Sequence, residues 1–106
     1  MSKGTSKTMT VIKMLPLLQY VFPEIKNAFY HVDQDTKEEY VSVRYVNFVY
    51  AEALNRFIED RASNAVLKIN VTADSPSALV DDVWRECKRR FGWYLIIMGN
   101  RIMKQW

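Results

Sequence analysis

The sequence predicts an α+β domain, and three segments carry that prediction. Residues 41–45 and 65–72 alternate apolar and polar side chains, which is the period-two pattern of half-buried strands. Residues 75–92 instead repeat apolar types every three to four positions, which is the pattern of an amphipathic helix. A chain of 106 residues, 49% of them hydrophobic, has the size of one domain with its own core.

The N-terminal part gives the weakest structural signal. Residues 1–8 are polar, so we expect a flexible tail there and a single globular domain over residues 9–106. The next 24 residues are strongly apolar, but Pro16 and Pro23 interrupt them. Because proline fits the first turn of a helix and damages its interior, we expect a short helix from Pro16 to near Phe22. The residues just before it, 9–14, could instead form an edge strand.

A β-hairpin is predicted next. Its arms are residues 28–32 and 41–45, and the loop between them contains turn-forming types. In the second arm Val41, Val43 and Tyr45 share one face, so this arm should be half buried.

A helix and a strand are expected after the hairpin. The helix would cover residues 48–61 with Asn47 as its N-cap. Its apolar stripe would consist of Ala51, Leu54, Phe57 and Ile58. The strand, residues 65–72, would place Leu67, Ile69 and Val71 on one face.

The third helix has the clearest boundaries. Ser75 can cap it, Pro76 occupies its first position, and Gly92 stands where the helix is expected to end. Its core-facing stripe repeats every four residues through Leu79, Val83, Cys87 and Phe91.

A terminal hairpin is expected over the last fourteen residues. Two apolar runs, residues 93–98 and 101–106, flank Gly99-Asn100, a dipeptide that favours a two-residue turn. The register from such a turn would oppose Trp93 to Trp106.

Together these elements give a core order of βαβαββ, preceded by an apolar helix or strand. Strand–helix–strand units favour parallel pairing, so we expect a mixed four- to five-stranded sheet with helices on one face. Over residues 40–106 this order resembles that of Alba-type nucleic-acid-binding proteins and of the C-terminal domain of translation initiation factor three. Residues 45–47 and 72–75 stand where Alba proteins have their basic and glycine-rich loops, so the resemblance concerns topology alone.

No residue pattern indicates catalysis, a metal or a cofactor. His31 and Cys87 are the only residues of their types, and no nucleophile signature accompanies either of them. One histidine and one cysteine cannot make a zinc site, and no glycine-rich phosphate loop is present. We therefore expect a binding protein and no enzyme.

The composition also bears on location. No apolar run approaches 18 residues, and the N-terminus lacks a signal-peptide pattern, so no membrane association is expected. A lone cysteine excludes an internal disulfide, which favours a soluble cytoplasmic protein.

The net charge of +3 permits an anionic partner, and two functional hypotheses follow. The first is a small basic domain that binds DNA or RNA through cations and aromatic rings. The residues expected at that surface are Arg85, Lys88, Arg89, Arg101, Lys104, Tyr94 and Trp106. Alternatively, the basic cluster at residues 88–90 only stabilises its helix, because cations near a helix C-terminus interact favourably with the helix dipole. The second hypothesis is a protein-interaction module, such as a small regulator or inhibitor that docks on a larger complex, with homodimerisation as one form.

Overall fold

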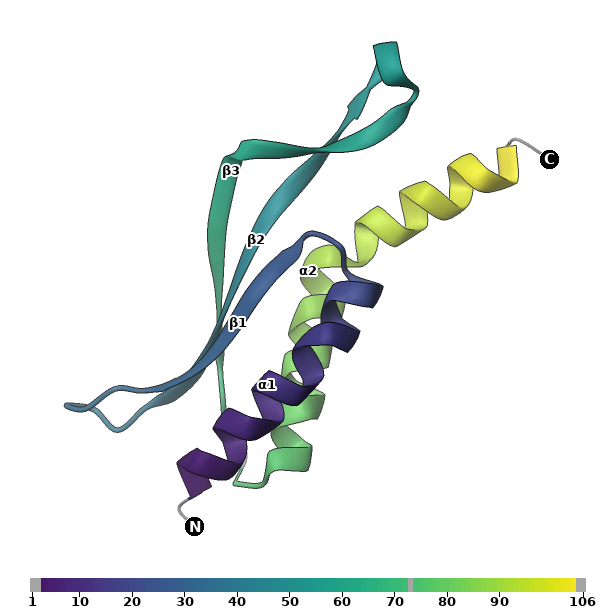
Figure 1. Ribbon diagram of the computed structural model, residues 1–106. Helices are drawn as coiled ribbons and strands as arrows, with labels where there is room; N and C mark the ends of the chain where they lie inside the picture. The colour runs from purple at the N-terminus through teal and green to yellow at the C-terminus, as the bar shows by residue number, and fades with distance from the viewer. Residues whose placement is uncertain (1–2, 73, 105–106) are drawn as a thin grey trace.

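The structure is a computed structural model that describes residues 3–72 and 74–104, without the side chains of residues 3–5, 61 and 93–104. Along the chain, three strands follow one long helix and precede a second one (Figure 1). The elements are α1 (Lys3–Val21), β1 (Ile25–Val32), β2 (Glu39–Ala51), the short 3-10 helix η1 (Glu52–Leu54), β3 (Arg56–Asn70) and α2 (Pro76–Lys104). The α+β class expected from the sequence is confirmed.

The three strands form one antiparallel sheet in the order β1-β2-β3. Both helices lie on the same face of this sheet, as expected, and leave the other face uncovered (Figure 1). The expected mixed sheet is wrong, because all three strands are antiparallel. The expected order βαβαββ is wrong too, because only the short 3-10 helix η1 separates β2 from β3. With that order, the topological resemblance to Alba-type proteins also disappears.

Helix α1 begins at Lys3, within the segment expected to be a tail, and Lys7 is buried with 1% exposure. Pro16 lies inside α1 rather than at its start. A proline removes one backbone hydrogen bond and disturbs the carbonyl four residues earlier. Since Pro16 is exposed, that carbonyl, at Ile12, lies on the side of the helix where water can reach it. The interruption is therefore tolerated.

The expected hairpin of residues 28–46 is confirmed, but the helix expected over residues 48–61 is wrong. Strand β2 continues to Ala51, and the chain reverses through η1 and Asn55, whose φ of 53° is left-handed. Aromatic and β-branched residues at 48–50 favour extended backbone. Tyr50 and Phe57 then pack edge to face across the strands, with ring centroids 5.4 Å apart. Such cross-strand pairs prevail over a weak helical stripe.

Helix α2 starts as expected but does not stop at Gly92. The Ser75 hydroxyl accepts a 3.2 Å hydrogen bond from the Ala78 amide, which makes Ser75 the N-cap. Gly92 has no positive φ, and the helix continues to Lys104, so the expected terminal hairpin is wrong. One glycine costs a helix only about 1 kcal/mol relative to alanine. The leucine, isoleucine and methionine residues that follow sustain a helix as well as a strand.

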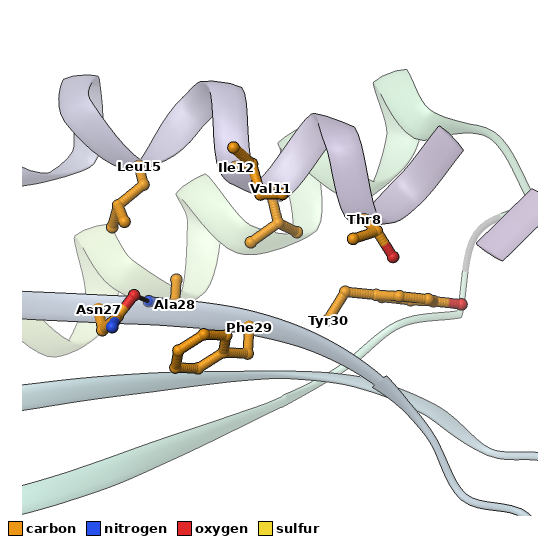
Figure 2. A pocket seen from close by; sticks show the side chains of 8 residues that line it. All are labelled: Thr8, Val11, Ile12, Leu15, Asn27, Ala28, Phe29 and Tyr30. Atoms are coloured by element: carbon orange, nitrogen blue, oxygen red, sulfur yellow. Dashed lines mark hydrogen bonds between the residues drawn. The ribbon is translucent and has the colours of Figure 1, made fainter. Parts of the chain in front are cut away.

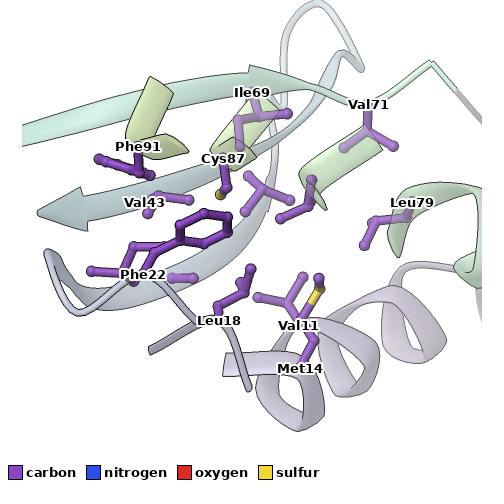
Figure 3. Packing of buried hydrophobic residues seen from close by; sticks show 14 residues of the cluster. Val11, Met14, Leu18, Phe22, Val43, Ile69, Val71, Leu79, Cys87 and Phe91 are labelled. Carbon is purple, nitrogen blue, oxygen red and sulfur yellow. The ribbon is translucent and has the colours of Figure 1, made fainter. Parts of the chain in front are cut away.

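The core lies between the sheet and the helices (Figure 3). The stripe expected on α2 is confirmed, since all four of its members are buried. Phe22, at the end of α1, is the meeting point of the layers: its ring centroid lies 5.7 Å from that of Trp84 and 6.0 Å from that of Phe91. This packing fixes both helices on one face and leaves the opposite face free.

Candidate nucleic-acid interface

The uncovered face of the sheet has a composition of its own. The strand register places every second residue of the three strands on this side, because successive side chains in a strand alternate between faces. Eight of the positions on this open face are Phe29, His31, Tyr40, Ser42, Arg44, Val66, Lys68 and Asn70. Among these eight positions there are three rings and two cations, and there is no carboxylate.

Three strands together build a cluster on the open face. The His31 and Tyr40 rings are stacked with centroids 4.8 Å apart, and Lys68 Nζ lies 4.7 Å from the Tyr40 centroid. His31 Nε2 also makes a 2.8 Å hydrogen bond with the Ser42 hydroxyl. A cation over an aromatic face is attracted by the electrons of the ring. The cluster therefore orders residues of β1, β2 and β3 relative to one another.

Phe29 is the most accessible ring of this face. It is 53% exposed, and its centroid lies 6.3 Å from that of His31. Figure 2 shows Phe29 on the side of β1 that faces away from α1, whereas Tyr30 extends toward Thr8 of α1. An apolar groove of about 190 Å³ runs between α1 and β1, beside the edge of the open face. An exposed ring at this place can accept a flat ligand group.

The turn between β1 and β2 holds an ordered carboxylate near the cluster. Asp33 accepts hydrogen bonds from the backbone amides of Asp35 (2.8 Å) and Thr36 (3.1 Å). These bonds, with a smaller contribution from the charge of Lys68, lower the pKa of the Asp33 carboxyl. The carboxylate thus stabilises the turn that connects the first two strands of the open face.

The helix-facing side of the sheet holds a buried ionic group of a different kind. Lys7 Nζ lies 2.6 Å from Glu39 Oε1, and the Tyr30 hydroxyl donates to the same oxygen. Burial, and next the hydrogen bond and charge of Glu39, raise the pKa of the Tyr30 hydroxyl. This group connects α1, β1 and β2, so its chemistry belongs to the fold and leaves the open face unaffected.

The basic residues singled out in the sequence lie elsewhere. Arg85, Lys88 and Arg89 are exposed on α2. They lie opposite the buried stripe of that helix, and therefore on the other side of the molecule from the open face. Arg85 pairs with Asp82, with Arg85 Nη2 2.8 Å from Asp82 Oδ1.

The remaining members of that set lie near the C-terminal end of the sequence. Tyr94, Arg101 and Lys104 belong to α2, where only the backbone is described, and Trp106 lies outside the described residues. Of the seven residues expected at the interface, the three whose side chains the structure describes, Arg85, Lys88 and Arg89, lie outside the open face.

The sequence did contain a signal for the open face. Ser42 and Arg44, and likewise Lys68 and Asn70, occupy the polar positions of the two alternating strands. Their alternation was visible, but their adjacency depends on the direct pairing of β2 with β3, which the erroneous helix at 48–61 concealed. Phe29 and Tyr40 were missed for the same reason.

The described part of the chain offers little for metal binding, for a membrane span or for a reactive thiol. The described residues include no group of three or more metal-binding side chains, and no described helix combines the length and apolarity that a membrane span requires. Cys87 is buried as expected, and burial, with a smaller effect of Glu86, raises the pKa of its thiol to about 12. A thiol of this kind is unreactive at neutral pH.

Comparison with protein-family models, with curated proteins and with solved structures gave no match to this chain. By its own fold, the chain is a two-helix α+β domain in which one face of the antiparallel sheet is uncovered.

Proposed function

We propose that this chain is a non-enzymatic domain that binds single-stranded nucleic acid on its open sheet face. The observation that carries the proposal is the combination of a half-exposed ring, Phe29, with two cations, Arg44 and Lys68, at strand positions that include no carboxylate. Base–aromatic stacking contributes about 1–3 kcal/mol per base, and neighbouring cations neutralise the phosphates. The single, buried Cys87 suits a reducing cell interior, which fits this role in the cytoplasm.

The geometry favours single strands over duplexes. Rings that lie on the face of a sheet reach base faces only when the bases are unstacked. In our proposal one base stacks on Phe29, while Arg44 and Lys68 approach the phosphates on either side. The His31–Tyr40 pair supports this arrangement because it holds the neighbouring strands in place.

Fluorescence anisotropy with labelled 12-nucleotide RNA, single-stranded DNA and duplex DNA tests this function. We expect the single strands to bind more tightly than the duplex, and Phe29→Ala to weaken binding about tenfold, as expected for one lost stacking contact. Tyr20→Ala is the matched control, because Tyr20 is an 86% exposed ring on α1, far from the open face. Equal effects of the two variants, or no binding at low salt, would refute the proposal.

A second candidate, a protein-interaction module, is favoured by the outward side of α1. Met9, Ile12 and Tyr20 recur at helical spacing and are 45%, 56% and 86% exposed. Exposed apolar stripes of this kind are typical of docking surfaces. Ile12→Glu would abolish docking to a protein partner at this stripe and leave oligonucleotide binding unchanged, so the two candidates are separable.

A further inference from the structure

Strand β1 is an edge of the sheet, and its outer side is open to pairing. The Asp33 amide donates a 2.8 Å hydrogen bond to the Glu38 carbonyl, which continues the ladder of β1 and β2 by one pair. Hydrogen-bonded and non-hydrogen-bonded pairs alternate along an antiparallel ladder. The backbone groups of Ala28, Tyr30 and Val32 therefore point away from β2, toward the outside of the sheet.

Little of this outer edge is occupied within the described part of the chain. The Gln19 side chain donates to the Lys26 carbonyl at 3.1 Å, and the Ala28 amide donates to Asn27 Oδ1 at 3.0 Å. Beyond these two contacts, no hydrogen bond among the described residues reaches the outer backbone groups of residues 28–32. Such an edge is a template for the addition of another strand.

An apolar groove lies along the same edge, between β1 and α1 (Figure 2). Its lining on the helix side includes Val11, Ile12 and Leu15, and Ile12 is 56% exposed. Residues 28–32 of the strand include no lysine, arginine, aspartate or glutamate, which are the side chains that protect many edge strands from pairing. The edge thus offers backbone groups and apolar contacts side by side, as strand addition requires.

The two ends of β1 carry opposite charges. Lys26 stands at its start, and Asp33 follows its last residue. A parallel neighbour of the same sequence would place like charges together, whereas an antiparallel one places Lys26 near Asp33 of the other strand. Asp33 is exposed, and the Lys26 side chain remains 33% exposed beside its ion-pair partner Glu59. In charge, β1 is therefore complementary to an antiparallel copy of itself.

We propose that β1 pairs with β1 of a second copy of this chain, in antiparallel orientation and centred near Phe29. One two-fold axis makes this contact closed and self-complementary. Ala28 of each protomer then stands opposite Tyr30 of the other, and the Ile12 sides of the two α1 helices face each other across the joined edge. The two three-stranded sheets become one, whose open faces stay uncovered. The proposal does not rest on nucleic-acid binding.

Sedimentation equilibrium on the full chain tests the dimer. The protomer has a mass of 12.5 kDa, so we expect a species of twice that mass at micromolar concentration. Ile12→Glu should raise the dimer dissociation constant at least about tenfold, because it places a charge at the centre of an apolar contact. Leu17→Glu is the matched control, since Leu17 is 54% exposed on the same helix and does not line the groove.

A second pair of variants tests the backbone contact. Val32→Pro removes an outward-pointing amide of β1. Val66→Pro does the same at the outer edge of β3, because the bond from the Val71 amide to the Glu39 carbonyl fixes the alternation there. Proline is tolerated where an edge amide faces outward, so both variants should keep the fold, which circular dichroism verifies. Only Val32→Pro should weaken the dimer.

Amide hydrogen exchange locates the contact without a substitution at the edge. The amides of Tyr30 and Val32 should exchange at least about tenfold more slowly in the wild-type dimer than in the Ile12→Glu variant. This comparison decides the matter if Val32→Pro does not fold. A strictly monomeric wild-type chain would overturn the proposal. A dimer that Ile12→Glu leaves intact, or edge amides that exchange equally fast in both proteins, would overturn it as well, because another surface would then hold the copies together.

Discussion

Lys68 Nζ lies 4.7 Å from the centre of the Tyr40 ring, which joins a cation of β3 to an aromatic ring of β2 on the uncovered side of the sheet. His31 of β1 stacks on the same ring. The open face is therefore ordered across all three strands before any ligand arrives. Preorganised groups lose little entropy on binding, which suits this face for ligand recognition.

The first prediction concerns the centre of the core. Phe22→Ala should lower the free energy of unfolding by about 3–5 kcal/mol, because it removes a ring that is 2% exposed and touches both Trp84 and Phe91. Urea denaturation followed by circular dichroism measures this loss. Phe29→Ala, on the open face, should change stability by less than about 1 kcal/mol. Similar losses in the two variants would mean that the layers are wrongly placed.

The second prediction compares two ion pairs. Glu39→Gln should destabilise the protein by about 3 kcal/mol, since it leaves the buried ammonium of Lys7 without its carboxylate. Glu59→Gln, which breaks the more exposed pair with Lys26, should cost less than about 1 kcal/mol. Chemical denaturation of both variants at neutral pH measures the two losses in free energy of unfolding. A larger loss for Glu59→Gln than for Glu39→Gln would contradict the burial of Lys7.

The third prediction concerns pH. Glu24 is 2% exposed, and its carboxylate oxygens have no hydrogen-bond partner among the described residues. Burial raises the pKa of this carboxyl, while its own backbone amide and the charge of Arg90 oppose the rise in part. The folded state therefore holds this proton to higher pH than the unfolded state does, so Glu24 lowers stability as the pH rises from its unfolded pKa of about 4.5 through its folded pKa.

Glu24→Gln removes that titration. The variant should be more stable than the wild type at pH 7, and the advantage should shrink as the pH falls toward 4. Thermal denaturation across this pH range measures the difference in stability between the variant and the wild type. Asp33, whose pKa is lowered, has the opposite effect on stability, but this effect is the same in both proteins and cancels. A variant that loses stability at pH 7 would show that the charged carboxylate has a stabilising partner.

The fourth prediction is that Cys87 is inert in the folded protein. Its thiol is buried, and its raised pKa of about 12 leaves almost no thiolate at neutral pH. Iodoacetamide should label it slowly at pH 8 without denaturant and rapidly with it. Equal rates in the two conditions would contradict its place in the core.

The sequence predicted the elements that a strong pattern or a cap defines. The period-two alternation identified the hairpin and the core-facing side of β3, and Ser75-Pro76 identified the start of α2. It did not predict residues 48–61, because their apolar positions satisfy a helical stripe and a strand alternation equally well. The decisive factor there is tertiary: the pairing of Tyr50 with Phe57 across a turn at Asn55.

The same ambiguity explains the error at the C-terminus, and it also explains why the sequence did not reveal the open face. The apolar pattern of the sequence 93–104 fits a strand with two apolar faces as well as a helix, so Gly99-Asn100 was interpreted as a turn. In the structure the segment is helical, because its helix propensity outweighs the turn preference of that dipeptide. The open face requires knowledge of which strands are neighbours. Phe29 and Lys68 are 39 positions apart, and only the register of three strands places them on one surface.

The salt dependence of single-stranded oligonucleotide binding tests the proposed interface most directly. Each phosphate contact contributes about 0.7 to the slope of log affinity against log salt concentration. We predict that Lys68→Gln lowers this slope by about that amount, whereas Lys88→Gln, an equal loss of charge on the far side of the molecule, leaves it unchanged. A slope that falls with Lys88→Gln and not with Lys68→Gln would contradict the open face as the binding surface and favour the exposed side of α2.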